Sequence, residues 1–290
     1  CIISAGSCQS EINVKNQSAN NHNTADATAA LIRAINSSEF CGALSQFLNT
    51  AAQFDHLVMF RYFHDAPPTV LSHDFDTRFS ADSLQTYLAG PYLLDPFFEE
   101  CRNAEPSGVI HLKDIAPDHF FRSEYYRTYY VTTRILDEVG IFVPMSDGAV
   151  IVATIERMRG NHPFRKREIE SYRAVEAIVR EAIVQNWRDA EALIGSHHSA
   201  VEQMGALPDR VRNVVKISGR TTLTNRESEV VSLVLRGYSS IAIAAILDIS
   251  AATVKVHRKH VYSKLKISSQ AELFSLFMPL LIPKLSDNGP

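Results

Sequence analysis

The chain has 290 residues, of which 46% are hydrophobic and 21% charged, and its 12 glycines and 12 prolines are too few for a collagen-like or low-complexity protein. This length predicts two domains, each with an apolar core of its own. The longest apolar runs, such as 241–247, are far shorter than the roughly 20 residues of a membrane span. The sequence does not start with a charged segment followed by an apolar one, so we expect a cytoplasmic protein.

The formal net charge of −3 hides an uneven distribution of charge along the chain. Residues 219–290 hold nine Lys or Arg and five Asp or Glu, whereas the preceding residues are acidic overall. Within this part, the stretch 249–271 has five basic residues and no acidic one. A local cationic stripe on an acidic chain is typical of a nucleic-acid-binding module, although a solvated helix face has the same composition.

The first part of the chain shows a mixed helix and strand pattern. Residues 1–26 are polar and are predicted to form a disordered tail. Residues 27–187 predict an α+β sensory domain, a PAS/GAF-like α/β/α sandwich in which helices flank a mostly antiparallel sheet. Helices are expected at 27–35, 40–52, 80–90, 95–103 and 164–187, and a long aromatic helix is expected within 118–133. A strand is expected near 108–112, and hairpins at 56–63 with 69–75 and at 138–145 with 149–158.

The last part of the chain has the local signals of short helices. After a predicted linker with a short helix at 188–220, residues 221–285 predict an all-α, four-helix domain. Thr224 and Glu227 form a capping box that begins a helix ending at Gly237. Ser250 is a suitable N-cap for a basic helix after a tight turn. Two short helices, a tight turn and a basic second helix predict a helix-turn-helix unit.

Residues 223–268 resemble the DNA-binding domain of the LuxR-type transcriptional regulators, which are also called GerE-type or NarL-type. The departures are Ser240, Ile241 and Ala242, where the family usually has Asn-Lys-Glu. The matching positions are Leu223, Thr224, Arg226, Glu227, Gly237, Ser239, Ile243, Ala244, Leu247, Ile249, Ser250, Thr253, Val254, Lys255, His257, Lys264 and Leu265.

The resemblance implies roles for residues of the basic helix. Lys255, Val256 and Lys259 are expected to face base edges, because lysine pairs with guanine O6 and N7 and valine contacts the thymine methyl group. The helix 269–281 resembles the family's fourth helix, whose exposed Phe, Leu and Met face implies a homodimer on double-stranded DNA. Further residues are expected near phosphates or in support of the helix: Thr253, His257, Arg258 and Lys264.

Residues 86–98 resemble the autoinducer-binding domain of quorum-sensing LuxR proteins, in which a tyrosine precedes an Asp-Pro pair. The resemblance implies that Asp95 accepts a hydrogen bond from the ligand. The family's Trp-x-x-x-Tyr pair has no counterpart, since the only tryptophan is Trp187, so the ligand is expected only to be a small amphipathic molecule. Capping the helix that follows is the favoured role for Asp95, because Asp before Pro at the first helical turn is a common N-cap, and the two roles can coexist. The candidate ligand-binding residues are Tyr87, Tyr92, Asp95, Tyr125 and Tyr129.

Two further clusters of side chains have simpler explanations than ligand binding. The aromatic residues between 120 and 130 are typical of a core, although several tyrosine hydroxyls there need partners. His56, His64 and His73 alternate along the first hairpin without the spacing of metal ligands, so we expect neither a metal nor a cofactor.

These patterns favour a LuxR-type, DNA-binding transcriptional activator controlled by a small-molecule signal in its first domain. The alternative is that this domain binds a protein partner or only dimerises, through the helix at 164–187. The sequence lacks a recognisable nucleophile, paired carboxylates or a metal site, so we do not expect an enzyme. RNA polymerase is a further candidate partner.

Overall fold

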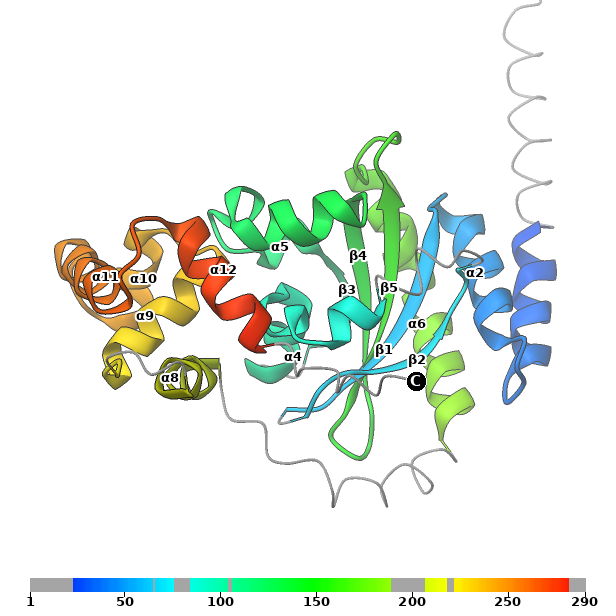
Figure 1. Ribbon diagram of the computed structural model, residues 1–290. Helices are drawn as coiled ribbons and strands as arrows, with labels where there is room; N and C mark the ends of the chain where they lie inside the picture. Colours follow the sequence, from blue (N-terminus) through cyan, green and yellow to red (C-terminus); the bar gives the residue numbers. More distant parts are fainter. Residues whose placement is uncertain are drawn as a thin grey trace, which may run out of the picture.

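The structure is a computed structural model that describes residues 23–64, 66–75, 84–103, 106–188, 207–217 and 222–281. An antiparallel five-stranded sheet with the order β2-β1-β5-β4-β3 lies at the centre of the N-terminal domain (Figure 1). Its strands are β1 (His56–Tyr62), β2 (Thr69–His73), β3 (Gly108–His111), β4 (Ile135–Pro144) and β5 (Val150–Met158).

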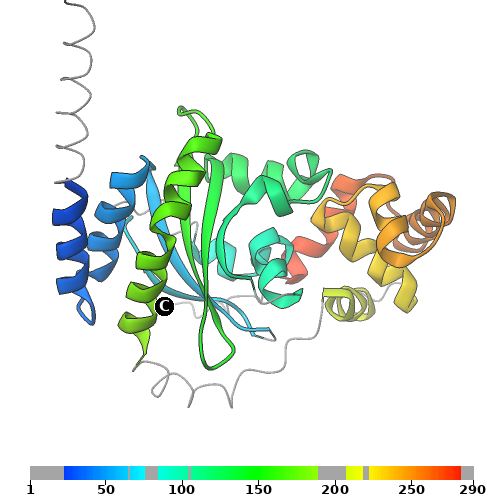
Figure 2. The same cartoon turned by 180° about the vertical axis from the view of Figure 1, so that it is seen from behind.

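Helices cover both faces of this sheet (Figures 1 and 2). One face packs against α2 (Phe40–Ala51) and α6 (Lys166–Trp187), with strand residues such as Leu57 and Ile151 fully buried. The mixed α/β architecture predicted from the sequence is therefore confirmed. The other face is covered by short elements: η1 (Pro91–Leu94), α4 (Pro96–Asn103), α5 (Leu112–Ile115), η2 (Phe120–Arg122) and η3 (Tyr126–Tyr130).

The long aromatic helix predicted within 118–133 is present but shorter, since it begins only after Ser123 and continues to residue 132. The 3₁₀ turn η2 ends at Ser123, whose backbone is extended with φ −69° and ψ 157°, and the π-helical η3 follows. The Ser123 hydroxyl accepts a hydrogen bond from the Tyr126 N–H at 3.1 Å and so starts the second segment. Helical spacing of aromatic residues does not indicate this start, because the backbone of His119 donates to the distant Gly237 carbonyl and turns the chain there.

The ends of the first domain differ from the prediction in smaller ways. A helix spans 23–34, so the predicted tail overlaps its first turn, and residues 1–22 lie outside the described residues. The helix predicted at 80–90 is described only over 84–88. In the predicted linker the structure describes residue 188 and α8 (Leu207–Ile217), which is the expected short helix.

The C-terminal helices begin and end where the local signals predicted. They are α9 (Asn225–Arg236), α10 (Ser240–Leu247), α11 (Ala251–Leu265) and α12 (Gln270–Leu281). The capping box at α9 is complete, because the Glu227 N–H donates to the Thr224 hydroxyl at 3.2 Å and the Thr224 N–H donates to the Glu227 carboxylate at 2.8 Å. Gly237 ends α9 with a left-handed φ of 93°, where a side chain would be strained.

The helices α10 and α11 meet at a bend of 105°, within the range expected for a helix-turn-helix unit. Among the helices that the structure describes, none is by itself long and apolar enough to span a membrane. By length and composition alone, the bent pair α10 and α11 passes that test together.

The capping box gives a direct stability prediction. We expect Thr224→Ala to lower the unfolding free energy by about 1 kcal/mol, because the first turn of α9 loses the acceptor for one N–H. Urea unfolding followed by circular dichroism measures this. The exposed neighbour Thr222, replaced by alanine, is the matched control and should leave the midpoint unchanged. Equal midpoints for the two variants would contradict a stabilising role for the capping box.

Candidate functional site

One face of α11 is exposed and basic, whereas the opposite face is part of the core. Lys255 and Lys259 are exposed, and Val256 between them is 49% exposed. Val254 and Val261 on the other face are fully buried against the domain. The structure therefore leaves the three residues predicted to face base edges accessible on one helix.

Two of the other predicted DNA-contacting residues, Lys264 and Arg258, are held by contacts within the domain. Lys264 forms an ion pair with the Glu227 carboxylate at 2.7 Å, so it links the end of α11 to the start of α9. Burial by itself raises the pKa of Glu227, but the hydrogen bonds from Lys264 and Thr224 outweigh it, and the pKa is lowered. Arg258 lies near the Tyr262 hydroxyl at 3.3 Å, His257 is half-buried and Thr253 is exposed at the first turn.

Asp95 caps α4 and also belongs to a buried polar cluster. Its Oδ1 accepts the Phe97 N–H at 2.9 Å, and its Oδ2 accepts the Tyr87 hydroxyl, which lies 3.0 Å from the Tyr62 hydroxyl. Burial raises the pKa of Asp95 to about 6, although the hydrogen bonds from Tyr87 and Phe97 act in the opposite direction. The capping role predicted as the simpler explanation is thus present, within a buried site.

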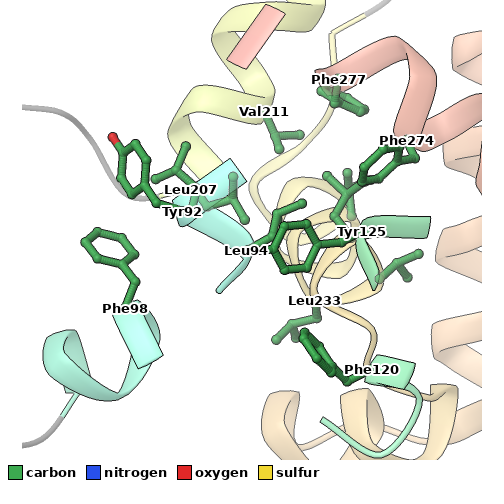
Figure 3. Packing of buried hydrophobic residues seen from close by; sticks show 14 of the residues in the cluster. Tyr92, Leu94, Phe98, Phe120, Tyr125, Leu207, Val211, Leu233, Phe274 and Phe277 are labelled. Atoms are coloured by element: carbon green, nitrogen blue, oxygen red, sulfur yellow. The ribbon is translucent and has the colours of Figure 1, made fainter. Parts of the chain in front are cut away.

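The structure brings four of the five predicted ligand-binding residues together. The rings of Tyr125 and Tyr129 stack with centroids 5.7 Å apart, and the Tyr87 ring lies 5.7 Å from that of Tyr129. Within the described part of the chain, the buried Tyr125 hydroxyl has no hydrogen-bond partner. Tyr92 lies at the border of this group: its ring is next to Leu207 of α8 (Figure 3), and its hydroxyl pairs with Arg210.

Two buried glutamates complete the cluster and were not among the residues predicted from the sequence. Glu138 of β4 and Glu156 of β5 are directly opposite each other in the sheet, and both are more than 90% buried. The Tyr130 hydroxyl donates to Glu138 at 2.6 Å. Burial, reinforced by the charges of Glu156 and Asp95, raises the pKa of Glu138 well above its ordinary value. The sequence alone did not indicate them, because an acidic residue in a strand normally marks the solvent face.

These carboxyls predict that the protein loses stability as the pH rises. Burial raises the pKa of Glu156 from 4.5 to about 7, against the lowering effect of the neighbouring His56. The folded state therefore binds more protons than the unfolded state between pH 4.5 and 7, and the unfolding free energy falls through that range. The difference in pKa corresponds to a contribution on the order of 3 kcal/mol from this group.

Urea unfolding at pH 5, 6, 7 and 8 measures this dependence. Glu156→Gln cannot ionise, so its stability should fall less steeply and exceed that of the wild type at pH 8. The groups that face Glu156 are His56, paired with Asp74 at 3.8 Å, together with Glu138 and Tyr129. Glu170→Gln, on the exposed side of α6, is the control. Parallel curves for wild type and Glu156→Gln would contradict the assignment.

The DNA-binding helices are docked on the helical cover of the sheet. Arg236 at the end of α9 forms a bidentate ion pair with Glu99 of α4, with N–O distances of 2.6 and 2.7 Å. The Ser239 N–H donates to Asp118 at 2.9 Å. A Cβ on Gly237 would lie 2.9 Å from the Phe120 Cα, so glycine allows this close approach. One apolar cluster crosses the contact and includes Leu94, Tyr125, Val211, Leu233 and Phe274 (Figure 3).

The apolar side of α12 is not exposed as predicted. Phe277 is fully buried and Phe274 is 7% exposed, because α12 packs against α8 and α9. These residues belong to the cluster that joins the two domains. The exposed face expected from the sequence is therefore wrong, because α12 packs these side chains against α8 and α9. Dimerisation through this helix stays a prediction.

Metal binding has no geometric support in the residues that the structure describes, since no three His, Cys, Asp or Glu side chains gather as ligands. An exposed basic helix in a helix-turn-helix unit, joined to a separate α/β domain, defines instead a DNA-binding regulator.

Comparisons with known proteins identify the family. The model of the luxR family of bacterial regulatory proteins, GerE, matches residues 221–277. A putative HTH-type transcriptional regulator in the exeN 3′ region of Aeromonas salmonicida is 32% identical over 188 residues, which are 65% of this chain and 95% of that protein. The chain belongs to the luxR family of bacterial regulatory proteins, whose members are transcriptional regulators and not enzymes.

Two further similarities cover smaller shares of the chain. The response regulator protein TodT of Pseudomonas putida is 34% identical over 105 residues, 35% of this chain and 44% of TodT. The crystal structure of the VqsR LBD domain from Pseudomonas aeruginosa is 25% identical and has a TM-score of 0.49, covering 56% of this chain and 95% of that domain.

Proposed function

We propose that this chain is a transcription regulator whose binding to DNA is controlled by a small molecule held in the N-terminal domain. The observation that carries the proposal is the buried cluster around Asp95, where the Tyr125 hydroxyl lacks a partner in the described part of the chain. Buried polar groups are nearly always paired, so an unpaired hydroxyl beside an ionisable carboxyl is a place for a ligand group. This domain, 27–187, is then a PAS/GAF-like sensory sandwich similar in role to autoinducer-binding domains.

The DNA contacts are proposed for the exposed side of α11. Lys255 and Lys259 donate to guanine in the major groove, and Val256 contacts a thymine methyl group. Thr253 and His257 lie at the edge of this surface and contact phosphates, whereas Arg258 and Lys264 mainly support the helix. The residues 221–285 act as the DNA-binding domain, joined through the linker 188–220.

The docking contact links the two sites. Asp95 directly follows Leu94, which packs in the cluster shared with α8 and α9 (Figure 3). A ligand that forms hydrogen bonds with Asp95 and Tyr87 therefore alters the surface against which the DNA-binding helices pack. A ligand shifts the equilibrium between the docked and undocked states only as far as its affinities for these two states differ.

The undocked state is proposed to be the active one. In it, the homodimer presents two α11 helices about one DNA turn apart. Activation of transcription in the cytoplasm, with RNA polymerase as a further partner, completes the proposed role in a quorum-sensing-like response.

One observation favours the alternative, a domain that binds a protein or only dimerises. Ile178 of α6 is 43% exposed on a helix proposed as an interface. A protein partner bound to α6 would increase the mass of the complex by the mass of that protein. A bound signal molecule would add a few hundred daltons at most.

Native mass spectrometry of the chain purified from its own host tests the proposed function. We expect an added mass of a few hundred daltons on the wild type and its loss in Asp95→Asn, which keeps a capping group for α4. Lys113→Ala, a change on the exposed surface, should keep the added mass. A wild-type chain without added mass, whose thermal stability does not respond to host extract, would contradict the proposal.

A further inference from the structure

The face of the sheet beneath the tyrosines has an ordered polarity. Because strand residues alternate between faces, every second residue of β1, β5 and β4 points to the same side. The strand register aligns His56, Glu156 and Glu138 in one row across the sheet. The next row holds Val58, Thr154 and Gly140, and the row after it holds Phe60, Val152 and Phe142. The face therefore runs from acidic through small to aromatic side chains.

The acidic row has too little positive charge around it. Two carboxyls directly opposite each other in adjacent strands repel when both are ionised, and burial strengthens the repulsion. Asp95 adds a third carboxyl, since its charge contributes to the raised pKa of Glu138. In the described part of the chain, the base that faces Glu156 is His56, which is already paired with Asp74 at 3.8 Å.

Two buried hydroxyls on this side of the sheet have no hydrogen-bond partner among the described residues. The Thr154 Oγ1, in the row beside Glu156, is buried and has no hydrogen-bond partner among the described residues. The Tyr125 hydroxyl is in the same condition. Each hydroxyl can accept a hydrogen bond as well as donate one, whereas an ionised carboxylate only accepts, so a group rich in N–H donors is the one that can serve all of them.

We propose that the signal molecule is an amphipathic organic amine, bound as its ammonium ion with the nitrogen between Glu138, Glu156 and the Thr154 hydroxyl. This inference rests on the proposed function and names the chemical class of its ligand. The apolar part of the amine lies along Phe60 and Phe142. The stacked rings of Tyr125 and Tyr129 add the attraction of aromatic faces for a cation.

The same charges discriminate against other ligands. An anion meets the repulsion of the acidic row. The carbonyl oxygens of a neutral molecule in the same position would face the carboxylate oxygens with no hydrogen-bond donor between them, unless the carboxyls are protonated. Glu138 and Glu156 are therefore specificity-determining residues for a positive ligand rather than supports of the fold alone.

Three probes with one ring and different charges test this inference at pH 7.5: benzylamine as its cation, neutral benzyl alcohol, and the phenylacetate anion. Calorimetric titration and thermal unfolding of the full chain give their affinities. We expect benzylammonium to bind at least tenfold more tightly than benzyl alcohol, and phenylacetate not to bind. Glu156→Gln, and separately Glu138→Gln, should reduce the preference for the cation at least tenfold, whereas the exposed control Glu170→Gln should retain it.

Several outcomes would overturn the inference. Benzyl alcohol bound as tightly as benzylammonium, no binding of benzylammonium, or an unchanged preference in both Gln variants each contradicts it. A neutral molecule found on the chain by native mass spectrometry overturns the ligand class but leaves the proposed function in place. The absence of any bound or stabilising small molecule overturns the proposed function itself.

Discussion

Lys255→Ala combined with Lys259→Ala is expected to weaken binding to a specific DNA site about 100-fold. Each well-placed base contact contributes about 1–3 kcal/mol, and these two side chains are the exposed cations proposed to reach base edges. The fold should be unaffected, because neither side chain forms an ion pair within the described residues. Fluorescence anisotropy with a duplex selected by the wild-type chain from a random library measures the loss.

A control variant with the same change in net charge distinguishes base recognition by α11 from nonspecific electrostatic attraction to DNA. Lys113→Ala combined with Lys166→Ala removes two exposed cations from the first domain, far along the chain from α11. This variant should bind the selected duplex within about twofold of the wild type. If the α11 variant retained wild-type affinity, the assignment of α11 as the recognition helix would be wrong.

Glu99→Ala is expected to separate the two domains. It leaves Arg236, with 11% of its side chain exposed, without its bidentate partner, and removal of one partner of a buried pair costs about 3 kcal/mol or more. The Arg236 Nε is already without a partner in the described part of the chain, so the loss is not easily compensated. We expect a larger radius of gyration by small-angle X-ray scattering, and two unfolding transitions where the wild type shows one.

The control for this variant breaks a comparable pair at the surface. Glu170→Ala removes the partner of Arg173 on the exposed side of α6 and should change stability by less than about 0.5 kcal/mol. An unchanged radius of gyration and a single transition for Glu99→Ala would show that the ion pair does not hold the domains together.

The C-terminal helices were predictable because their boundaries depend on neighbours in the sequence. The Thr224–Glu227 capping box, the glycine at 237 and the Ser250 N-cap act within one helical turn, and the structure confirms each of them. The break at Ser123 was not predictable in the same way. It depends on the backbone contact between His119 and Gly237, which are far apart in the sequence.

The buried site was predictable only in part. Asp95 and the tyrosines stand out because an Asp-Pro pair and clustered aromatic residues are unusual. Glu138 and Glu156 did not stand out, since an acidic residue in a strand normally marks the solvent face. Only the cover formed by η3 and the pairing of β4 with β5 buries both of them. The burial of α12 likewise depends on its packing against α8 and α9, which local patterning does not specify.

The measurement that tests the central claim most directly is the DNA affinity of the full chain with and without the small-molecule fraction of host extract. The account predicts that this fraction changes the dissociation constant for the selected duplex at least tenfold for the wild type. The Asp95→Asn variant should bind the same duplex but not respond. Equal affinities of the wild type in both conditions would contradict control of this regulator by a small molecule.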